Sequence, residues 1–363
     1  MASPSKALDP GDAAPDQVAL PLGGLSPSMD VLAVAAALAS RGHNVSVVVP
    51  QDDIPFSRSA ASRHGGGDGA DLLEWIAYDM PFTVNSEVMR DMAARVKGVR
   101  NPLRVLANLM EVMGRPCSLM FSNATLMAAL ESGRYEAVLT FNMPGDWADS
   151  CGCVLAHSLG VPLMTVHGIP FITAPLSVPQ FGSGLDDQAL ATWRGRTRNL
   201  LSFMMTRTMS AVTGIVSRRS MAGIRRQRRL PRGPASQGRA CAPMLQLDAN
   251  SFHLDPPRPL GPPHALIGPI APRFARPSLE PPEVAAFVDS APAGVAVVSF
   301  GSAPIFGTFL TRKDFLELSL AFADLAPTRV VWLLKPRNMP DDVSIGELPL
   351  GDNTITAPWV SRS

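Results

Sequence analysis

Gly301 and Ser302 directly follow the apolar run Val295–Phe300, a pattern typical of a buried strand that opens into a tight loop. A glycine turn at the end of a strand can point backbone N–H groups at a negatively charged ligand. The chemistry that these residues predict is therefore the binding of an anion.

The segments next to this turn supply the elements that would hold it. Residues Thr311–Leu325 carry apolar side chains at helical spacing from Phe315 onward, and Arg329–Leu334 is a second apolar run. Strand, loop, helix and strand form a βαβ unit, which predicts a parallel sheet with its ligand site at the carboxyl ends of the strands.

The amino-terminal half shows the same alternation. A short strand at Val18–Leu22, a turn at Gly23–Ser28 and a helix at Met29–Ser40 precede Arg41-Gly-His43 and the next strand. This order is typical of the first unit of a doubly wound α/β sheet. Further strands are expected at 72–78, 135–141 and 160–166, with a helix at 147–159.

Length and composition place the chain among globular proteins. Its 363 residues, 46% of them hydrophobic, are enough for two domains. The net charge of +1 gives no general indication of a nucleic-acid partner. Met1–Asp16 has no apolar core, which indicates a disordered segment and no signal peptide, and no window is apolar enough for a membrane span. A cytoplasmic location is expected.

The cysteines give no recognisable pattern. None forms a CxxC pair, so neither a zinc site nor a disulfide framework is expected, and packed thiols are favoured. They are Cys117, Cys151, Cys153 and Cys241.

One stretch has an unusual charge balance. Between Asp187 and Asp248 the chain has no carboxylate but twelve arginines, including those of Arg225–Arg229. Such a cluster can bind RNA or anionic lipid. It lacks the interleaved aromatic residues of RNA-binding modules, so a solvated helix face is the favoured interpretation.

Four separated segments, in this order, carry a resemblance to a known family. They are Pro257–Ile270 (PRPLGPPHALIGPI), Pro281–Ser290 (PPEVAAFVDS), Val295–Ser302 (VAVVSFGS) and Asn353–Val360 (NTITAPWV). Together they resemble the UDP-glycosyltransferases of the two-domain GT-B type. The Arg41-Gly-His43 segment is similar to the end of that family's first helix, where the histidine is structural.

The resemblance implies a GT-B fold, in which two Rossmann-like α/β domains face a cleft. On this chain it implies a disordered start at 1–16, an acceptor-side domain at 17–254, a proline-rich linker and helix at 255–290, and a partial UDP-sugar donor domain at 291–363. The later donor-domain motifs of the family are expected beyond Ser363.

The function that the resemblance implies is the transfer of a hexose from a UDP-sugar, with inversion, to a hydroxyl of a small lipophilic acceptor. Gly301 and Ser302 match the family residues beside the diphosphate, and Trp359 matches the tryptophan that stacks on uracil. The resemblance implies no metal, no further cofactor, no nucleic-acid partner and no membrane span. It leaves the oligomeric state open. Candidates for the acceptor pocket are Met143, Phe171 and Phe181.

The catalytic pair of the family has no counterpart in this sequence. Its histidine base falls on Pro27 or Gly24, depending on the alignment, and its aspartate falls on Asn142. None of these side chains can accept a proton as a base. A weakly active or inactive chain is therefore expected, and two alternatives stay open: a non-catalytic relative that binds small molecules, and a truncated product of an active transferase.

Overall fold

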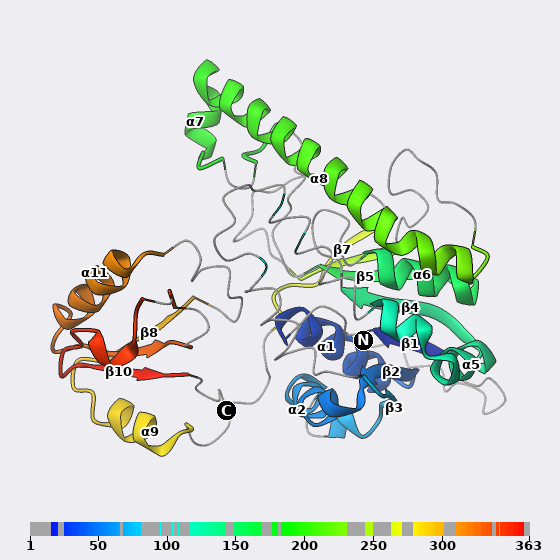
Figure 1. Cartoon of the computed structure of the whole chain (residues 1–363), viewed down its shortest axis with the longest axis horizontal. Coiled ribbons are helices and arrows are strands. Elements are labelled where there is room, and N and C mark those ends of the chain that lie inside the picture. Colours follow the sequence, from blue (N-terminus) through cyan, green and yellow to red (C-terminus); the bar gives the residue numbers. More distant parts are fainter. Residues whose placement is uncertain are drawn as a thin grey trace, which may run out of the picture. The chain divides into compact units, whose positions relative to one another are not determined.

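The computed structural model divides the chain into two compact units, Met1–Pro81 with Met113–Ala271, and Phe82–Val112 with Pro272–Ser363. Figure 1 shows the elements of both units. The residues that the structure describes are 16–20, 25–65, 68–80, 95, 104, 108, 117–141, 149–167, 176–180, 183–230, 244–249, 263–270, 279–300, 310–335, 339–340 and 342–358.

The first unit contains a parallel sheet of seven strands in the order β3-β2-β1-β4-β5-β6-β7. The direction of winding reverses between β1 and β4, which makes this the switch point where ligands of doubly wound sheets bind. The prediction of a doubly wound sheet is confirmed. The strands are β1 Asp16–Leu20, β2 Asn44–Pro50, β3 Glu74–Tyr78, β4 Tyr135–Phe141, β5 Leu163–His167, β6 Leu245–Asp248 and β7 His264–Leu266.

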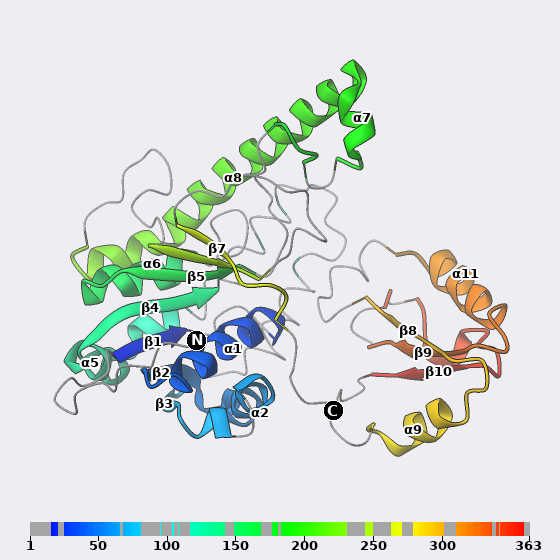
Figure 2. The ribbon, with the colours of Figure 1, turned by 180° about the vertical axis from the view of Figure 1, so that it is seen from behind.

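Helices cover both faces of this sheet (Figure 2). One core cluster joins α1 and α2 to β2, β4 and β5, and the other joins α5, α6 and the end of α8 to the opposite face. Because both faces are covered, β2 is apolar at consecutive positions, and Val47, Val48 and Val49 are all buried. The helices are α1 Leu25–Ala39, α2 Ile54–Gly65, α5 Ala124–Ser132, α6 Asp149–Leu159, α7 Asp187–Ala191 and α8 Trp193–Gln227, with 3-10 turns η1 Gln51–Asp53 and η2 Asp68–Ala70.

A disulfide joins two segments on one face of this sheet, and the expectation of unpaired cysteines is wrong at this point. Cys117 and Cys151 are bonded, with Cα atoms 5.7 Å apart and a sequence separation of 34. Both belong to the core cluster that α5 and α6 form against the sheet. No sequence motif marks this pair, because only the packing of two helical segments on one face brings these thiols together.

The second unit confirms the predicted βαβ arrangement. Strands β8 Val295–Ser299, β9 Arg329–Leu333 and β10 Thr354–Ala357 form a parallel sheet in the order β10-β9-β8, and helix α11 Arg312–Ala323 connects β8 to β9. Within the described residues this unit also contains helix α9 Pro282–Asp289 and the 3-10 turn η6 Ile345–Glu347.

Helix α11 begins at a capping box and packs on a tryptophan. The Thr311 hydroxyl accepts from the backbone N–H of Asp314, and the Asp314 carboxylate accepts from the backbone N–H of Thr311. Phe315 and Phe322 of α11 lie 5.8 Å and 5.0 Å, between ring centroids, from the fully buried Trp332 of β9. Helix α9 covers the opposite face of β9 and β10.

No helix in the parts of the chain that the structure describes is both long enough and apolar enough to cross a lipid bilayer.

Candidate functional site

The carboxyl edge of the first sheet is where its topology predicts a ligand site. Strand β4 ends at Phe141, which lies opposite Val166 of β5, and β1 ends at Leu20 beside β4. Pro27, one of the two positions of the family base, lies in the first turn of α1. The other position, Gly24, and the aspartate position, Asn142, lie outside the described residues.

Asp30 in α1 is a carboxyl group near this edge that the sequence analysis missed. It is only partly exposed, and burial raises its pKa from 3.8 to about 6. Its environment therefore favours the protonated form more than water does. A recognisable signal was present, since Asp30 is the only acidic residue in an Ala/Val/Leu-rich helix.

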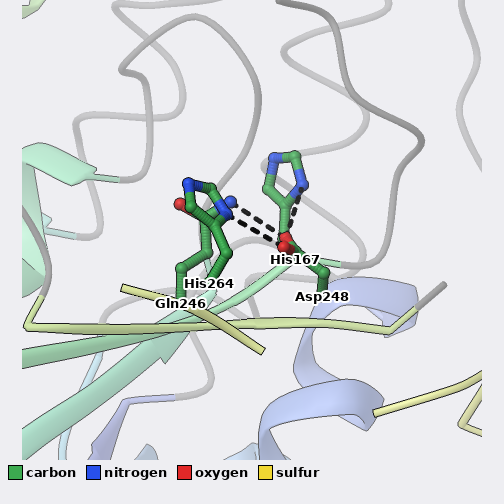
Figure 3. A network of polar contacts seen from close by, with 4 residues as sticks. All are labelled: His167, Gln246, Asp248 and His264. Atoms are coloured by element: carbon green, nitrogen blue, oxygen red, sulfur yellow. Dashed lines mark hydrogen bonds and ion pairs between the residues drawn. The ribbon is translucent and has the colours of Figure 1, made fainter. Parts of the chain in front are cut away.

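A second polar group lies on the last three strands of the same sheet. His167 ends β5 and pairs in register with Asp248, which ends β6, while Gln246 of β6 pairs with His264 of β7. Cross-strand partners and residues two apart on one strand share a face, so all four side chains lie on one side of the sheet. Figure 3 shows the two imidazoles and the amide gathered around the Asp248 carboxylate.

Asp248 is the centre of this cluster. Its side chain is 1% exposed. Gln246 Nε2 donates a hydrogen bond to Oδ1 at 2.9 Å, and His264 Nδ1 lies 3.0 Å from Oδ2, so the imidazole N–H donates to the carboxylate. His167 Nδ1 lies 3.8 Å from Oδ1, which is beyond hydrogen-bond distance.

The two imidazoles have different surroundings. Burial lowers the pKa of His167, the nearby Asp248 carboxylate acts in the opposite direction, and His264 lowers it further. His167 is therefore neutral at neutral pH, whereas the more exposed His264 is the imidazole hydrogen-bonded to the carboxylate. An imidazole oriented by a carboxylate can bind a hydroxyl group or exchange a proton with it.

No sequence motif predicts this cluster, although parts of it carry a signal. His167 and Asp248 each follow directly on the apolar residues of a strand. A polar residue at the carboxyl end of a strand is a candidate site residue in this fold class. Which of these strand ends are neighbours depends on the order of strands, and that order is a tertiary property.

Asn199 of α8 holds the described segment that precedes the acceptor candidate Phe181. Its side-chain oxygen accepts from Gln180 N at 2.7 Å, and its Nδ2 donates to Val178 O at 2.9 Å. Asn199 is 1% exposed. The candidates Met143, Phe171 and Phe181 themselves lie outside the described residues.

The residues that the resemblance assigns to the donor site follow the strands at the carboxyl edge of the second sheet. Ser299, Leu333 and Ala357 form one row across β8, β9 and β10. Gly301 and Ser302 follow β8, and Trp359 follows β10; all three lie outside the described residues. The two outer strands of the row are about 10 Å apart, at roughly 4.8 Å for each strand spacing.

No cluster of three or more His, Cys, Asp or Glu residues in the described ranges is arranged to hold a metal ion.

Two parallel α/β units, the first doubly wound and the second built on a βαβ motif, define a class of protein. Solved glycosyltransferases share this fold. The structure of UGT89C1 from Arabidopsis thaliana complexed with UDP matches 95% of this chain and 70% of its own, with a TM-score of 0.52 and 15% sequence identity. The complex of the same protein with quercetin matches with a TM-score of 0.50 and 16% identity. The fold is that of the GT-B glycosyltransferases.

The family follows from the sequence comparison. The family model described as UDP-glucoronosyl and UDP-glucosyl transferase matches residues 20–362, and the chain belongs to that family. UDP-glucuronosyltransferase 3A1 of Bos taurus is 24% identical over 91% of this chain and 60% of its own length. UDP-glucuronosyltransferase 3A1 of Homo sapiens is 26% identical over 73% of this chain and 48% of its own length.

The chain thus spans about three fifths or less of the length of these curated relatives.

Proposed function

We propose that this chain binds a UDP-sugar and a small lipophilic acceptor, and that its reaction is hexose transfer to an acceptor hydroxyl with inversion. The observation that carries this proposal is the family match over residues 20–362, which includes the segments of both carboxyl edges. The names of the relatives refer to glucuronosyl transfer and that of one solved neighbour to bound UDP, which supports a UDP-sugar as the donor.

The donor side rests on Gly301, Ser302 and Trp359. The turn after β8 would supply backbone N–H groups and a hydroxyl to the diphosphate. Trp359, which follows β10 at the other side of the three-stranded sheet, would stack on uracil. The row Ser299–Leu333–Ala357 supports this, because a span of about 10 Å between the outer strands suits a ligand the size of a nucleoside diphosphate.

Turnover by this chain is proposed to be very low. Inverting transfer needs a base to remove the proton of the acceptor hydroxyl. Neither Pro27 nor Gly24 can act as one, and Asn142 cannot orient one as a carboxylate does. The His264–Asp248 pair lies on β6 and β7, two and three strands from β4, so we assign it to binding the acceptor and not to the family's proton transfer.

Calorimetry with UDP tests the donor site directly. The wild-type chain is expected to bind UDP, and Trp359→Ala is expected to weaken binding by about 10- to 100-fold, since stacking of a base on an aromatic ring contributes about 1–3 kcal/mol. Trp193→Ala, at an 84% exposed tryptophan of α8, is the matched control and should leave the affinity unchanged. Absence of UDP binding in the wild-type chain would refute the proposal.

Turnover is tested separately with radiolabelled UDP-glucose and UDP-glucuronic acid and a panel of phenols and sterols. UDP binding without glycoside formation is the expected result. Robust glycoside formation would overturn the prediction of low turnover but leave the donor site in place. Binding of acceptors without binding of UDP would indicate a small-molecule-binding relative.

The location of the protein stays a prediction. The sequence favours the cytoplasm, whereas disulfides persist mainly in oxidising compartments, so the Cys117–Cys151 bond argues the other way. Alkylation of free thiols in intact cells, followed by peptide mapping, distinguishes the two: modified Cys117 and Cys151 indicate a reducing compartment.

A further inference from the structure

Helix α8 has an apolar stripe on its exposed side. The six exposed apolar residues that form this stripe fall within a sector of about 140° around the helix axis, at 100° for each residue. The exposed fractions of these residues range from 44% to 84%, so the stripe is open to solvent. They are Trp193, Leu200, Leu201, Met204, Met205 and Ile215.

The packing of the helix does not account for this stripe, because α8 contacts the rest of its unit through another face. Gly195 is buried, and a Cβ there would collide with the carbonyl of Ala189. Asn199 is buried on the same side, where it holds the 176–180 segment. Near the other end, Ile224 is buried in the core. The side that faces the protein is thus partly small and polar, and the apolar residues face outward.

The amino-terminal half of α8 also extends past the sheet, as Figures 1 and 2 both show. A helix of 35 residues is about 52 Å long at 1.5 Å for each residue. Its apolar stripe is therefore long and presented at the periphery of the unit, where a large flat surface can reach it.

Arginines border the stripe on both sides. At 100° for each residue, Arg196 and Arg207 lie along one border and Arg198 along the other, while Arg194 lies within the stripe near the border of Arg198. All four are exposed. No carboxylate occurs between Asp187 and Asp248, so no acidic side chain of α8 offsets this positive charge.

We propose that α8 docks on the surface of an anionic lipid bilayer, with the apolar stripe inserted at the level of the headgroups and the arginines on lipid phosphates. An exposed apolar stripe beside basic residues suits the interface of an anionic membrane, and each basic residue near such a surface strengthens binding. A second copy of the chain is a poorer occupant, because pairing of two such stripes would bring the arginines of both copies together. Single-stranded RNA would use the arginines but leave the aliphatic side chains in water.

Co-sedimentation with vesicles is the test. The full chain is expected to bind vesicles of phosphatidylcholine with about a third phosphatidylserine, to bind pure phosphatidylcholine much more weakly, and to dissociate as salt rises. Binding should shift the tryptophan emission to the blue, and Trp193→Phe should lose most of that shift, since Trp193 is 84% exposed in the free protein.

Two sets of variants separate the apolar and charged contributions. Replacement of Leu200, Leu201, Met204 and Met205 by Gln should abolish binding, while the matched control Leu72→Gln, at another exposed leucine of the same unit, should bind normally. Arg194→Gln with Arg196→Gln and Arg198→Gln should weaken binding by about fivefold for each charge. Circular dichroism of each variant confirms that the helix is retained.

The matched charge control is Arg41→Gln with Arg134→Gln, two exposed arginines outside α8, which should change binding little. The proposal is overturned if the chain does not bind anionic vesicles at low salt, or if the α8 variants bind as well as the wild type. It is also overturned if gel filtration shows a dimer that the apolar variants dissociate, or if RNA binds and vesicles do not.

Discussion

The Cys117–Cys151 disulfide allows a quantitative prediction about stability. The bond closes a loop of 34 positions, and the chain-entropy model of a loop of this length gives about 4 kcal/mol of stabilisation. The first unit has roughly 240 residues, for which each kcal/mol corresponds to a shift of about 2–4 °C in Tm. Loss of the bond should therefore lower the Tm of this unit by about 8–15 °C.

The perturbation is substitution of either cysteine by alanine, alone and together. Both side chains are almost fully buried, so each alanine also removes some packing. Because each single variant already breaks the bond, the double variant should lose little more free energy of unfolding than either single variant. Urea unfolding of the four proteins, followed by circular dichroism, measures these free energies, and peptide mapping without reductant confirms the pairing.

The cycle also defines the contrary result. Two packed thiols without a bond would give losses near 1 kcal/mol in each single variant, well below the roughly 4 kcal/mol expected for the bond. Losses of that small size, together with free thiols at Cys117 and Cys151 in the peptide map, would refute the disulfide and restore the interpretation of buried free thiols.

Three further predictions follow from burial. Asp30→Asn should raise the free energy of unfolding at pH 7 by about 1.5 kcal/mol. A pKa near 6 implies roughly 3 kcal/mol, and we take half of that because the carboxyl is partly exposed. The raised pKa favours the folded state only at low pH, so urea titrations should show the gain vanish below about pH 4. His167 faces Asp248 and His264 and has a lowered pKa, so unfolding below about pH 6.5 takes up a proton. The free energy of unfolding should therefore fall as the pH drops below about 6.5. A His167→Gln variant with an unchanged pH profile would contradict this. Trp332→Ala should lower the free energy of unfolding of the second unit by about 3–5 kcal/mol. Trp332→Phe should lower it much less, because phenylalanine keeps a ring and removes a buried indole N–H that has no partner among the described residues. Equal losses for the two variants in urea unfolding would contradict the packing argument.

Local sequence patterns were sufficient to predict the helices and strands and the class of fold. The run Val295–Ser299, the helical spacing of α11 and the second run at β9 predict a βαβ unit, because strand and helix periodicities are properties of neighbouring residues. The family motifs predicted the residues of the donor site. They also indicated that the catalytic pair is replaced by Pro27 or Gly24 and by Asn142. Those assignments rest on the resemblance, and the described residues do not test them.

The sequence by itself determined which segments are strands and helices, and that α8 is rich in arginine and free of acid. Only the tertiary structure decided that Cys117 meets Cys151, that His167 and His264 share one carboxylate, and that α8 turns its apolar side outward. The physical reason is the range of the forces involved. Periodicity is fixed by backbone geometry over a few residues, whereas pairing, strand order and the buried face of a helix depend on the packing of segments that are far apart in the chain.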